Sequence, residues 1–376
     1  MKKVLIYLLS SIMVLSSVSC GGKDKTVKVT VSDTGYYERF KDQGLSINVY
    51  NWGEYIADGS ESGIIDVNEE FEKLTGIKVN YTTYSTNEEL YAKMKGGGTD
   101  YDIIIPSDYM ISRMIKEDML APLDYSAIPN TQYIMDSFKN PAYDQENQYS
   151  VPYMWGTVGI IYDKEAVSEE MIDWDILWNE KYKGQVLMFD NPRDAFAIAE
   201  IMLGYSINTE NPDELRAAAD KLVEQKQNNI VQAYVMDEIF DKMGAKEAVV
   251  APYYAGDAVT LMQDYEHLGF VIPESGTNRF VDAVCIPKTS QKIEAAQMYI
   301  NFLCEPEIAL SNSTYIGYST PNQATYELLD EEIKNDGISY LDDGYLNNKT
   351  TIFYNLSDEA NQLMQDLWVD IKSFNN

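Results

Sequence analysis

Acidic and aromatic side chains recur together in five short segments, each next to an apolar run of the chain. An alkylammonium ligand needs this combination, because its N–H groups only donate hydrogen bonds and its charge is attracted to the faces of aromatic rings. Burying such a charge without carboxylates would cost on the order of several kcal/mol. The pattern therefore favours a site for an organic cation. The five segments are 51–55, 106–109, 190–194, 252–257 and 280–282.

Acidic residues of this kind also have a simpler structural explanation. An Asp or Asn that follows a strand often caps a helix, a role open to Asp58, Asp66 and Asp190. Paired carboxylates beside rings also occur in the cleft of a glycosidase or a sugar receptor. His267 is the only histidine, and no nucleophile and base are recognisable. We therefore predict a binding protein without catalytic residues, metal or cofactor, with a secreted carbohydrate-active protein as the alternative.

The segments must be positioned by regular elements, and the apolar pattern predicts strands and helices in alternation. Thr86-Asn87-Glu88-Glu89 has the form of a capping box that begins a helix. Alternating strands and helices indicate mainly parallel sheets flanked by helices, with ligands bound at the carboxyl ends of the strands. We predict an α/β protein with two such lobes. The predicted strands are 45–50, 77–81, 101–105, 158–162, 185–189, 248–251 and 270–272, and helices include 195–203 and 213–225.

The composition limits the possible partners. The chain has 376 residues, and 29 Lys and Arg against 60 Asp and Glu give a net charge of −31. This charge repels nucleic acid and anionic lipid and favours cationic partners. The hydrophobic content of 45% indicates a packed globular protein rather than a disordered acidic chain.

The N-terminal segment predicts export. Lys2 and Lys3 precede an apolar stretch, and small residues at 16–19 lead to Cys20. The order resembles a bacterial lipoprotein signal, with residues 1–19 removed, Cys20 lipidated and 20–44 forming a tether. A plain secretory signal with an incidental cysteine is the alternative. No later apolar stretch is long enough to span a membrane. We predict that Cys285 and Cys304 are free buried thiols.

Several segments resemble the polyamine-binding proteins of bacterial ABC transporters, which bind spermidine and putrescine. The resemblance implies a two-lobe periplasmic-binding-protein fold of type II with hinge crossovers, an interlobe cleft, and delivery of the ligand to an ABC permease. It also implies lobe 1 at 45–155 and 283–325, and lobe 2 at 156–282 and 326–376. We expect an exported monomer that is lipid-anchored at the cell envelope or periplasmic. The segments that carry the resemblance are 50–56, 84–88, 101–107, 151–156 and 316–322.

The resemblance also implies the ligand-binding residues. Asn191 replaces an aspartate of spermidine binders, whereas Asp257 supplies an acid found in putrescine binders. These departures favour putrescine, while Gly53 and the overall similarity favour spermidine, so both ligands are expected to bind. Asp282 is expected to hold a nitrogen of the ligand. The implied residues are Trp52, Gly53, Glu54, Tyr55, Ser107, Tyr109, Asn191, Asp194, Tyr254, Asp257, Phe280, Asp282, Tyr318 and Tyr354.

Overall fold

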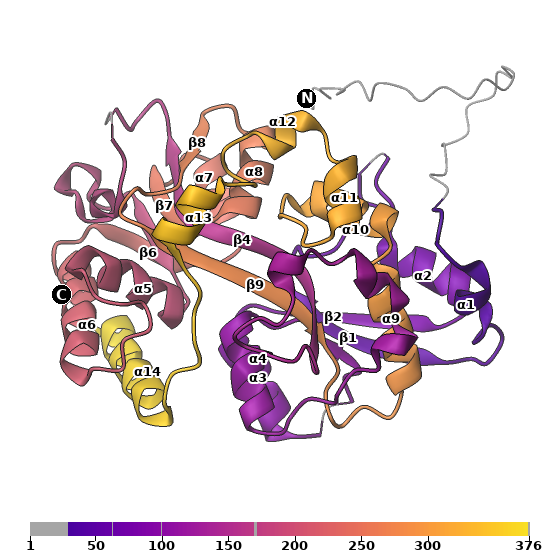
Figure 1. Cartoon of the computed structure of the whole chain (residues 1–376). Coiled ribbons are helices and arrows are strands. Elements are labelled where there is room, and N and C mark those ends of the chain that lie inside the picture. Colours follow the sequence, from indigo (N-terminus) through magenta and orange to yellow (C-terminus); the bar gives the residue numbers. More distant parts are fainter. Residues whose placement is uncertain (1–28, 62, 99, 169–170, 375–376) are drawn as a thin grey trace, which may run out of the picture.

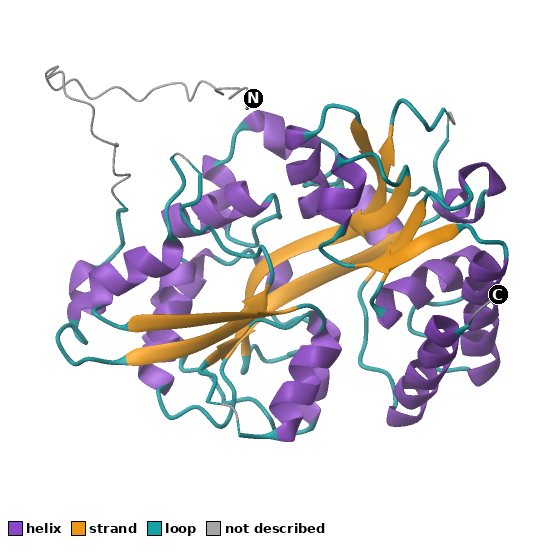
Figure 2. Ribbon diagram, turned by 180° about the vertical axis from the view of Figure 1, so that it is seen from behind, coloured by secondary structure: helices purple, strands orange, loops and turns teal. Residues whose placement is uncertain are grey.

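The computed structural model describes residues 29–61, 63–98, 100–168 and 171–374. The predicted signal and Cys20 lie outside these residues. Helices flank the strands on both sides (Figure 2). The strands are β1 (Ser46–Trp52), β2 (Lys78–Tyr84), β3 (Ile103–Ile104), β4 (Ser150–Asp163), β5 (Val186–Phe189), β6 (Val231–Val235), β7 (Val250–Tyr254), β8 (Leu268–Val271), β9 (Thr277–Cys285) and β10 (Thr350–Thr351).

The helices lie mostly between consecutive strands, as the alternating pattern predicts. Short 3-10 helices occur at Tyr125–Ala127, Pro129–Tyr133, Asp136–Phe138, Trp174–Trp178 and Glu180–Tyr182. The α-helices are α1 (Thr34–Glu38), α2 (Val67–Thr75), α3 (Asn87–Gly96), α4 (Asp108–Lys116), α5 (Pro192–Leu203), α6 (Pro212–Gln227), α7 (Ile239–Gly244), α8 (Ala255–Asp264), α9 (Ile293–Leu303), α10 (Pro306–Ile316), α11 (Gln323–Leu328), α12 (Glu331–Lys334), α13 (Asp343–Lys349) and α14 (Asp358–Ser373).

Two groups of parallel strands are joined by a pair of long antiparallel strands. The strand order is β2-β1-β3-β9-β4-β7-β5-β6, and β8 and β10 pair with β4 and β9. β1 runs parallel to β2 and β3, and β5 runs parallel to β6 and β7. β4 and β9 pair antiparallel and cross the centre of the molecule (Figure 1). The strand ends of both groups therefore face the region beside β4 and β9.

Local signals explain where the helices begin. The Thr86 hydroxyl accepts a hydrogen bond from the Glu89 amide at 3.1 Å, and the Glu89 carboxylate accepts one from the Ser85 amide at 2.9 Å. The first bond confirms Thr86 as the N-cap of α3, as predicted. The second differs from the predicted capping box, because Glu89 accepts from the amide of Ser85, one residue before the N-cap, rather than from that of Thr86. Asp66 caps α2 by accepting from the Glu69 amide. Its predicted structural role is therefore confirmed.

The sequence pattern predicted only part of β4 and did not predict β6, β9 or β10. Nearly every residue of β4 is buried, so its first half shows no alternation and the predicted strand 158–162 is too short. β6 was not predicted, because its residues are mostly half-buried and lack a clear apolar face. β4 belongs to the central pair of strands, and β6 is followed by a loop that lines a cavity between the two groups of strands.

The prediction that 20–44 is only a tether is wrong for its described part. Tyr37 is fully buried, and its hydroxyl donates a 2.8 Å hydrogen bond to Glu305. The Ser32 hydroxyl donates to the same carboxylate, also at 2.8 Å. Aromatic anchors in a polar segment therefore dock it onto α9 and α10.

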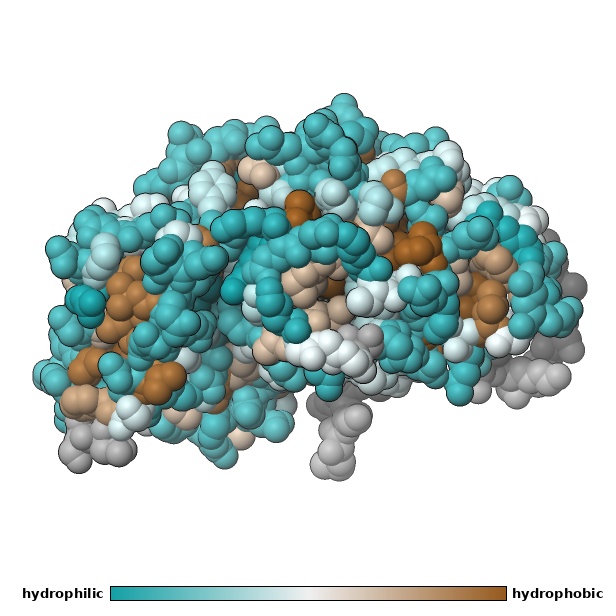
Figure 3. All heavy atoms as spheres, turned by 90° about the horizontal axis from the view of Figure 1, so that it is seen from below, coloured by the Kyte–Doolittle hydropathy of each residue, from teal (hydrophilic) through white to brown (hydrophobic). Residues whose placement is uncertain are grey.

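The surface and core agree with the composition. Hydrophilic residues cover most of the face seen in Figure 3, with apolar areas between them. Cys285 and Cys304 are free and buried, which confirms that prediction. Within the described ranges, none of the helices combines the length and apolarity needed to cross a membrane.

Candidate functional site

A cavity enclosing about 720 Å³, its mouth included, lies where the two groups of strands meet β9. Every predicted ligand-binding residue except Tyr354 lines it. The predicted residues were thus brought together from segments spread over most of the chain. The lining consists of Trp52, Gly53, Glu54, Tyr55, Tyr84, Ser85, Asn87, Ser107, Tyr109, Asn191, Asp194, Met236, Asp237, Phe240, Tyr253, Tyr254, Asp257, Asn278, Phe280, Asp282, Tyr318 and Phe353.

Most of these side chains sit at junctions between a strand and the next helix. Ser107 is the N-cap of α4, and Asn191 is the N-cap of α5, where its side chain accepts from the Arg193 amide at 3.1 Å. Asp194 and Asp257 lie in the first turns of α5 and α8. The carboxyl ends of the parallel strands therefore supply the site, as predicted.

Asp190 has a different role from the one that sequence reasoning considered. Its carboxylate forms an ion pair with Lys372 at 2.7 Å, and the cap of α5 is its neighbour Asn191. Asp58, the third candidate cap, instead accepts hydrogen bonds from the Ser60 amide and the Tyr315 hydroxyl. The capping explanation therefore holds for Asp66 but not for Asp58 or Asp190.

Asp282 is held rigidly in the wall formed by β9. Its Oδ1 accepts a hydrogen bond from the Ser107 hydroxyl at 2.6 Å, and its Oδ2 accepts one from the Tyr55 hydroxyl at 2.7 Å. Burial raises the pKa of Asp282 to about 6, although both hydrogen bonds act in the opposite direction. The carboxylate is therefore oriented before any ligand binds, and an added cation would favour its ionised form.

Asp194 and Asp257 repeat the same pairing of an acid with a tyrosine. The Tyr254 hydroxyl donates to Asp194 at 2.7 Å, and the Tyr318 hydroxyl donates to Asp257 at 2.9 Å. Burial raises the pKa of Asp194 to about 7 and that of Asp257 to about 8. Nearby negative charges add to both shifts, notably Asp237 beside Asp257. The positive charge of the neighbouring Arg193 lowers the pKa of Asp194, but burial has the larger effect.

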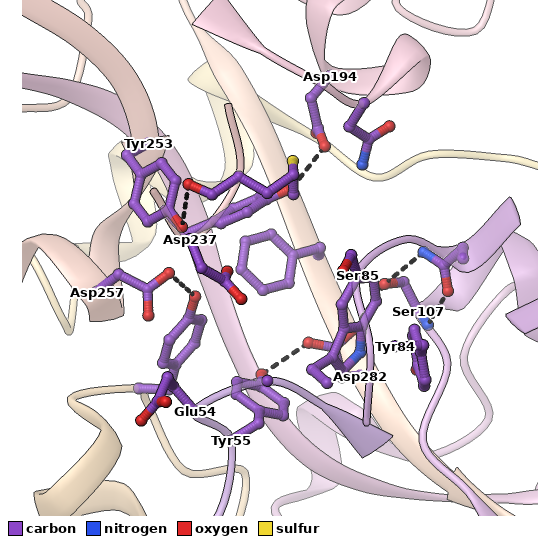
Figure 4. A pocket seen from close by; sticks show the side chains of 18 of the residues that line it. Glu54, Tyr55, Tyr84, Ser85, Ser107, Asp194, Asp237, Tyr253, Asp257 and Asp282 are labelled. Atoms are coloured by element: carbon purple, nitrogen blue, oxygen red, sulfur yellow. Dashed lines mark hydrogen bonds between the residues drawn. The ribbon is translucent and has the colours of Figure 1, made fainter. Parts of the chain in front are cut away.

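The acids in Figure 4 surround one space from several sides. No Lys, Arg or His occurs among the described residues that line it. The acidic side chains of the lining are Glu54, Asp194, Asp237, Asp257 and Asp282.

Aromatic rings form the apolar walls between the acids. The ring centroids of Tyr254 and Phe280 lie 5.4 Å apart, and those of Phe280 and Tyr318 lie 6.1 Å apart. Tyr55 meets Tyr318 edge-on at 4.9 Å. Rings attract ammonium groups and pack against methylene chains. The cavity is therefore suited to a short alkyl chain that carries several positive charges.

Sequence reasoning missed Asp237, which lies at the rim of the cavity in the loop after β6. A Cβ atom on Gly53 would lie 2.8 Å from Asp237 Oδ2, so glycine at this position leaves room for the carboxylate across the mouth. The signal that could have found it is the same as for the other acids, namely a carboxylate after a strand. It was missed because β6 itself was not predicted.

Tyr354 does not line the cavity and is 57% exposed. Its neighbour Phe353 takes that place, with its ring centroid 5.8 Å from that of Tyr109. Consecutive residues of an extended segment point in opposite directions, so the side chain at 354 is turned away. We therefore replace Tyr354 by Phe353 in the candidate site.

Comparisons with known proteins cover most of the chain. The family model described as bacterial extracellular solute-binding protein matches residues 67–339. The spermidine/putrescine-binding periplasmic protein of Escherichia coli (strain K12) is 35% identical over 303 residues, which are 80% of this chain and 84% of that protein. Among solved structures, the spermidine/putrescine ABC transporter substrate-binding protein PotD of Streptococcus pneumoniae has a TM-score of 0.72 and 36% identity, covering 87% of this chain and 98% of that chain. The TpPotD lipoprotein of Treponema pallidum has a TM-score of 0.74 and 26% identity over 87% of this chain and 99% of that chain.

Proposed function

Since the chain belongs to the bacterial extracellular solute-binding proteins, we propose that it captures a polyamine in the acidic and aromatic cavity and delivers it to an ABC permease. Its α/β fold is that of the solved relatives, which confirms the predicted fold class. The relatives are solute-binding transport proteins, and their names include spermidine and putrescine.

One observation carries the proposal: the cavity has five acidic residues and no basic one among its described lining residues. A polyamine supplies several protonated nitrogens on a methylene chain, which matches separated carboxylates joined by ring walls. Neutral sugars need hydrogen-bonding partners but no such excess of negative charge. The carbohydrate-active alternative is therefore not favoured.

We propose that the ligand drives closure of two lobes, with the bounds 45–155 and 283–325 for the first and 156–282 and 326–376 for the second. The hydrogen bond between Tyr318 and Asp257 would join these lobes across the cavity. Repulsion between carboxylates opposes closure until a cation is bound, so the ligand shifts the equilibrium by its higher affinity for the closed form.

The test is a calorimetric titration of the purified chain with putrescine, spermidine, spermine, cadaverine and agmatine. We expect at least one of the diamines or triamines to bind and to be recovered unchanged, because binding without turnover is proposed. A panel of neutral mono- and disaccharides serves as the comparison. Binding of a sugar without binding of any amine would contradict the proposal.

Ligand preference should depend on positions 191 and 257. Asn191→Asp keeps a side-chain oxygen that can cap α5 but adds a negative charge, so spermidine affinity should rise relative to putrescine. Asp257→Asn should weaken putrescine more than spermidine. Each variant should change the ratio of putrescine to spermidine affinity about tenfold, because gaining or losing one charged partner of an ammonium group changes affinity by about that factor.

Competition assays with the two amines measure these ratios. If both variants leave the ratio of putrescine to spermidine affinity unchanged, neither side chain determines ligand preference. Asn191 would then serve only as the N-cap of α5.

We propose that Cys20 is lipidated and holds the protein at the cell envelope. Cys20→Ser should release the protein into the medium or leave it uncleaved, since we propose no other anchor. Fractionation of cells that express each form measures this. A variant that stays with the membrane fraction after normal cleavage would contradict the lipoprotein assignment.

A further inference from the structure

Asn278 lies on the same face of β9 as two residues of the candidate site. Side chains alternate between the two faces of a strand, so Asn278, Phe280 and Asp282 point to one side. All three line the cavity. Phe280 and Asp282 were predicted from the sequence as ligand-binding residues, whereas Asn278 was not.

The side-chain oxygen of Asn278 is buried without a hydrogen-bond partner. The residue is 4% exposed, and its Oδ1 accepts no hydrogen bond from any residue that the structure describes. Buried polar atoms are normally paired, because an unpaired acceptor loses its bonds to water without compensation. The unpaired oxygen in a ligand cavity therefore indicates a partner that the protein itself does not supply.

Four hydroxyl donors of the cavity lining already have acceptors. The hydroxyls of Tyr55, Tyr254 and Tyr318 donate to three of the cavity's carboxylates. The Ser107 hydroxyl donates to Asp282 as well. If one of these hydroxyls turned to donate to Asn278 Oδ1 instead, a carboxylate would lose its hydrogen bond. An N–H group of the ligand could supply the missing donor without that loss.

The backbone fixes Asn278 at the point where the C-terminal segment meets the cavity. Asn278 pairs in register with Thr351 of β10, and Phe353, two residues further, belongs to the lining. The side chain thus stands on a strand rather than on a mobile loop, which suits a residue that orients a ligand.

We propose that Asn278 is a ligand-recognition residue whose Oδ1 accepts an N–H of the bound polyamine. The assignment rests on the proposed function and deepens it. A protonated amine carries two or three N–H groups, and each oxygen of Asp282 already accepts one hydrogen bond from the protein. A neutral acceptor satisfies one of them without adding another negative charge to a cavity that already contains five acids.

The test compares Asn278→Leu and Asn278→Asp with the parent, by titration with putrescine and with spermidine. Asn278→Leu has a similar size but no acceptor, so affinity for at least one amine should fall about tenfold. The melting temperature without ligand should stay the same or rise, because an unpaired polar atom is removed. Asn278→Asp keeps an acceptor and should retain binding at pH 8.

Thr157→Val is the matched control. The Thr157 hydroxyl is also buried without a hydrogen-bond partner in the described chain, but it lies on β4 outside the cavity lining. Thr157→Val should leave both affinities unchanged.

Parent-like affinities of Asn278→Leu for both amines would overturn the assignment. So would a lower melting temperature of ligand-free Asn278→Leu, which would indicate a structural role. Loss of binding in Asn278→Asp would mean that the ligand accepts rather than donates at this position, and would overturn it too. If the parent binds none of the amines, the proposed function fails together with this assignment, whereas a failure confined to the variants leaves the proposed function intact.

Discussion

Asp282→Asn should reduce polyamine affinity by about 2–5 kcal/mol, the cost of removing one partner from a buried charge pair. This corresponds to a loss of roughly 30-fold to several thousand-fold. The side chain is 4% exposed, so water cannot replace the missing charge. An asparagine would also place an NH2 group against one of two hydroxyl donors, Ser107 or Tyr55, which now point at the carboxylate.

The measurement is a calorimetric titration of parent and variant with the amine that binds the parent most tightly. Asp264→Asn is the control, because it makes the same charge change at an exposed position at the end of α8. Circular dichroism checks that both variants are folded. A folded Asp282→Asn protein with the affinity of the parent would show that the proposed orientation of the ligand is wrong.

Polyamine affinity should fall by about 100-fold or more between pH 8 and pH 5, because the cavity acids must lose their protons to bind a cation. Burial raises the pKa of Asp257, Asp194 and Asp282 to about 8, 7 and 6. Alkylammonium groups resemble Lys, whose ordinary pKa is about 10.4, so the charge of the ligand changes little in this range. Binding near pH 7 should therefore release protons into the buffer.

Calorimetry in phosphate and in Tris measures this release, since the two buffers differ in their enthalpy of ionisation. Asp257→Asn should reduce the number of protons released near pH 7.5, because it removes the group with the highest of the three pKa values. An affinity that is constant from pH 8 to pH 5, with no proton release, would contradict the expectation.

The same pKa shifts predict the opposite effect of pH on the stability of the ligand-free protein. The ordinary pKa of an Asp is about 3.9, so between pH 4 and 8 these three groups bind more protons in the folded than in the unfolded state. Their contribution to the free energy of unfolding should therefore increase as pH falls from 8 towards 5. The melting temperature of the ligand-free protein should rise as pH falls from 8 to 5, while polyamine binding weakens. A general destabilisation by acid would instead lower the melting temperature together with the affinity.

The sequence by itself determined the features that depend on neighbours along the chain. The N-cap at Thr86 involves only four consecutive residues, and the N-cap at Asp66 involves a similarly short segment. Alternating apolar patterns gave the fold class for the same reason. Acids placed after strands could also be found, because the carboxyl ends of parallel strands lie at one edge of a sheet wherever the strands occur in the chain.

The tertiary structure alone decided which of these residues meet and which side chains face the ligand. Asp237 enters the lining because its loop lies opposite Gly53, which is far away in the sequence. Phe353 faces inward and Tyr354 outward because a shift of one residue in an extended segment reverses the side chain. The missing partner of Asn278 likewise appears only after every neighbouring donor is in place. These features depend on contacts between residues that are far apart in the sequence. Their distance in space is set by the arrangement of the whole sheet, so no short stretch of sequence encodes them.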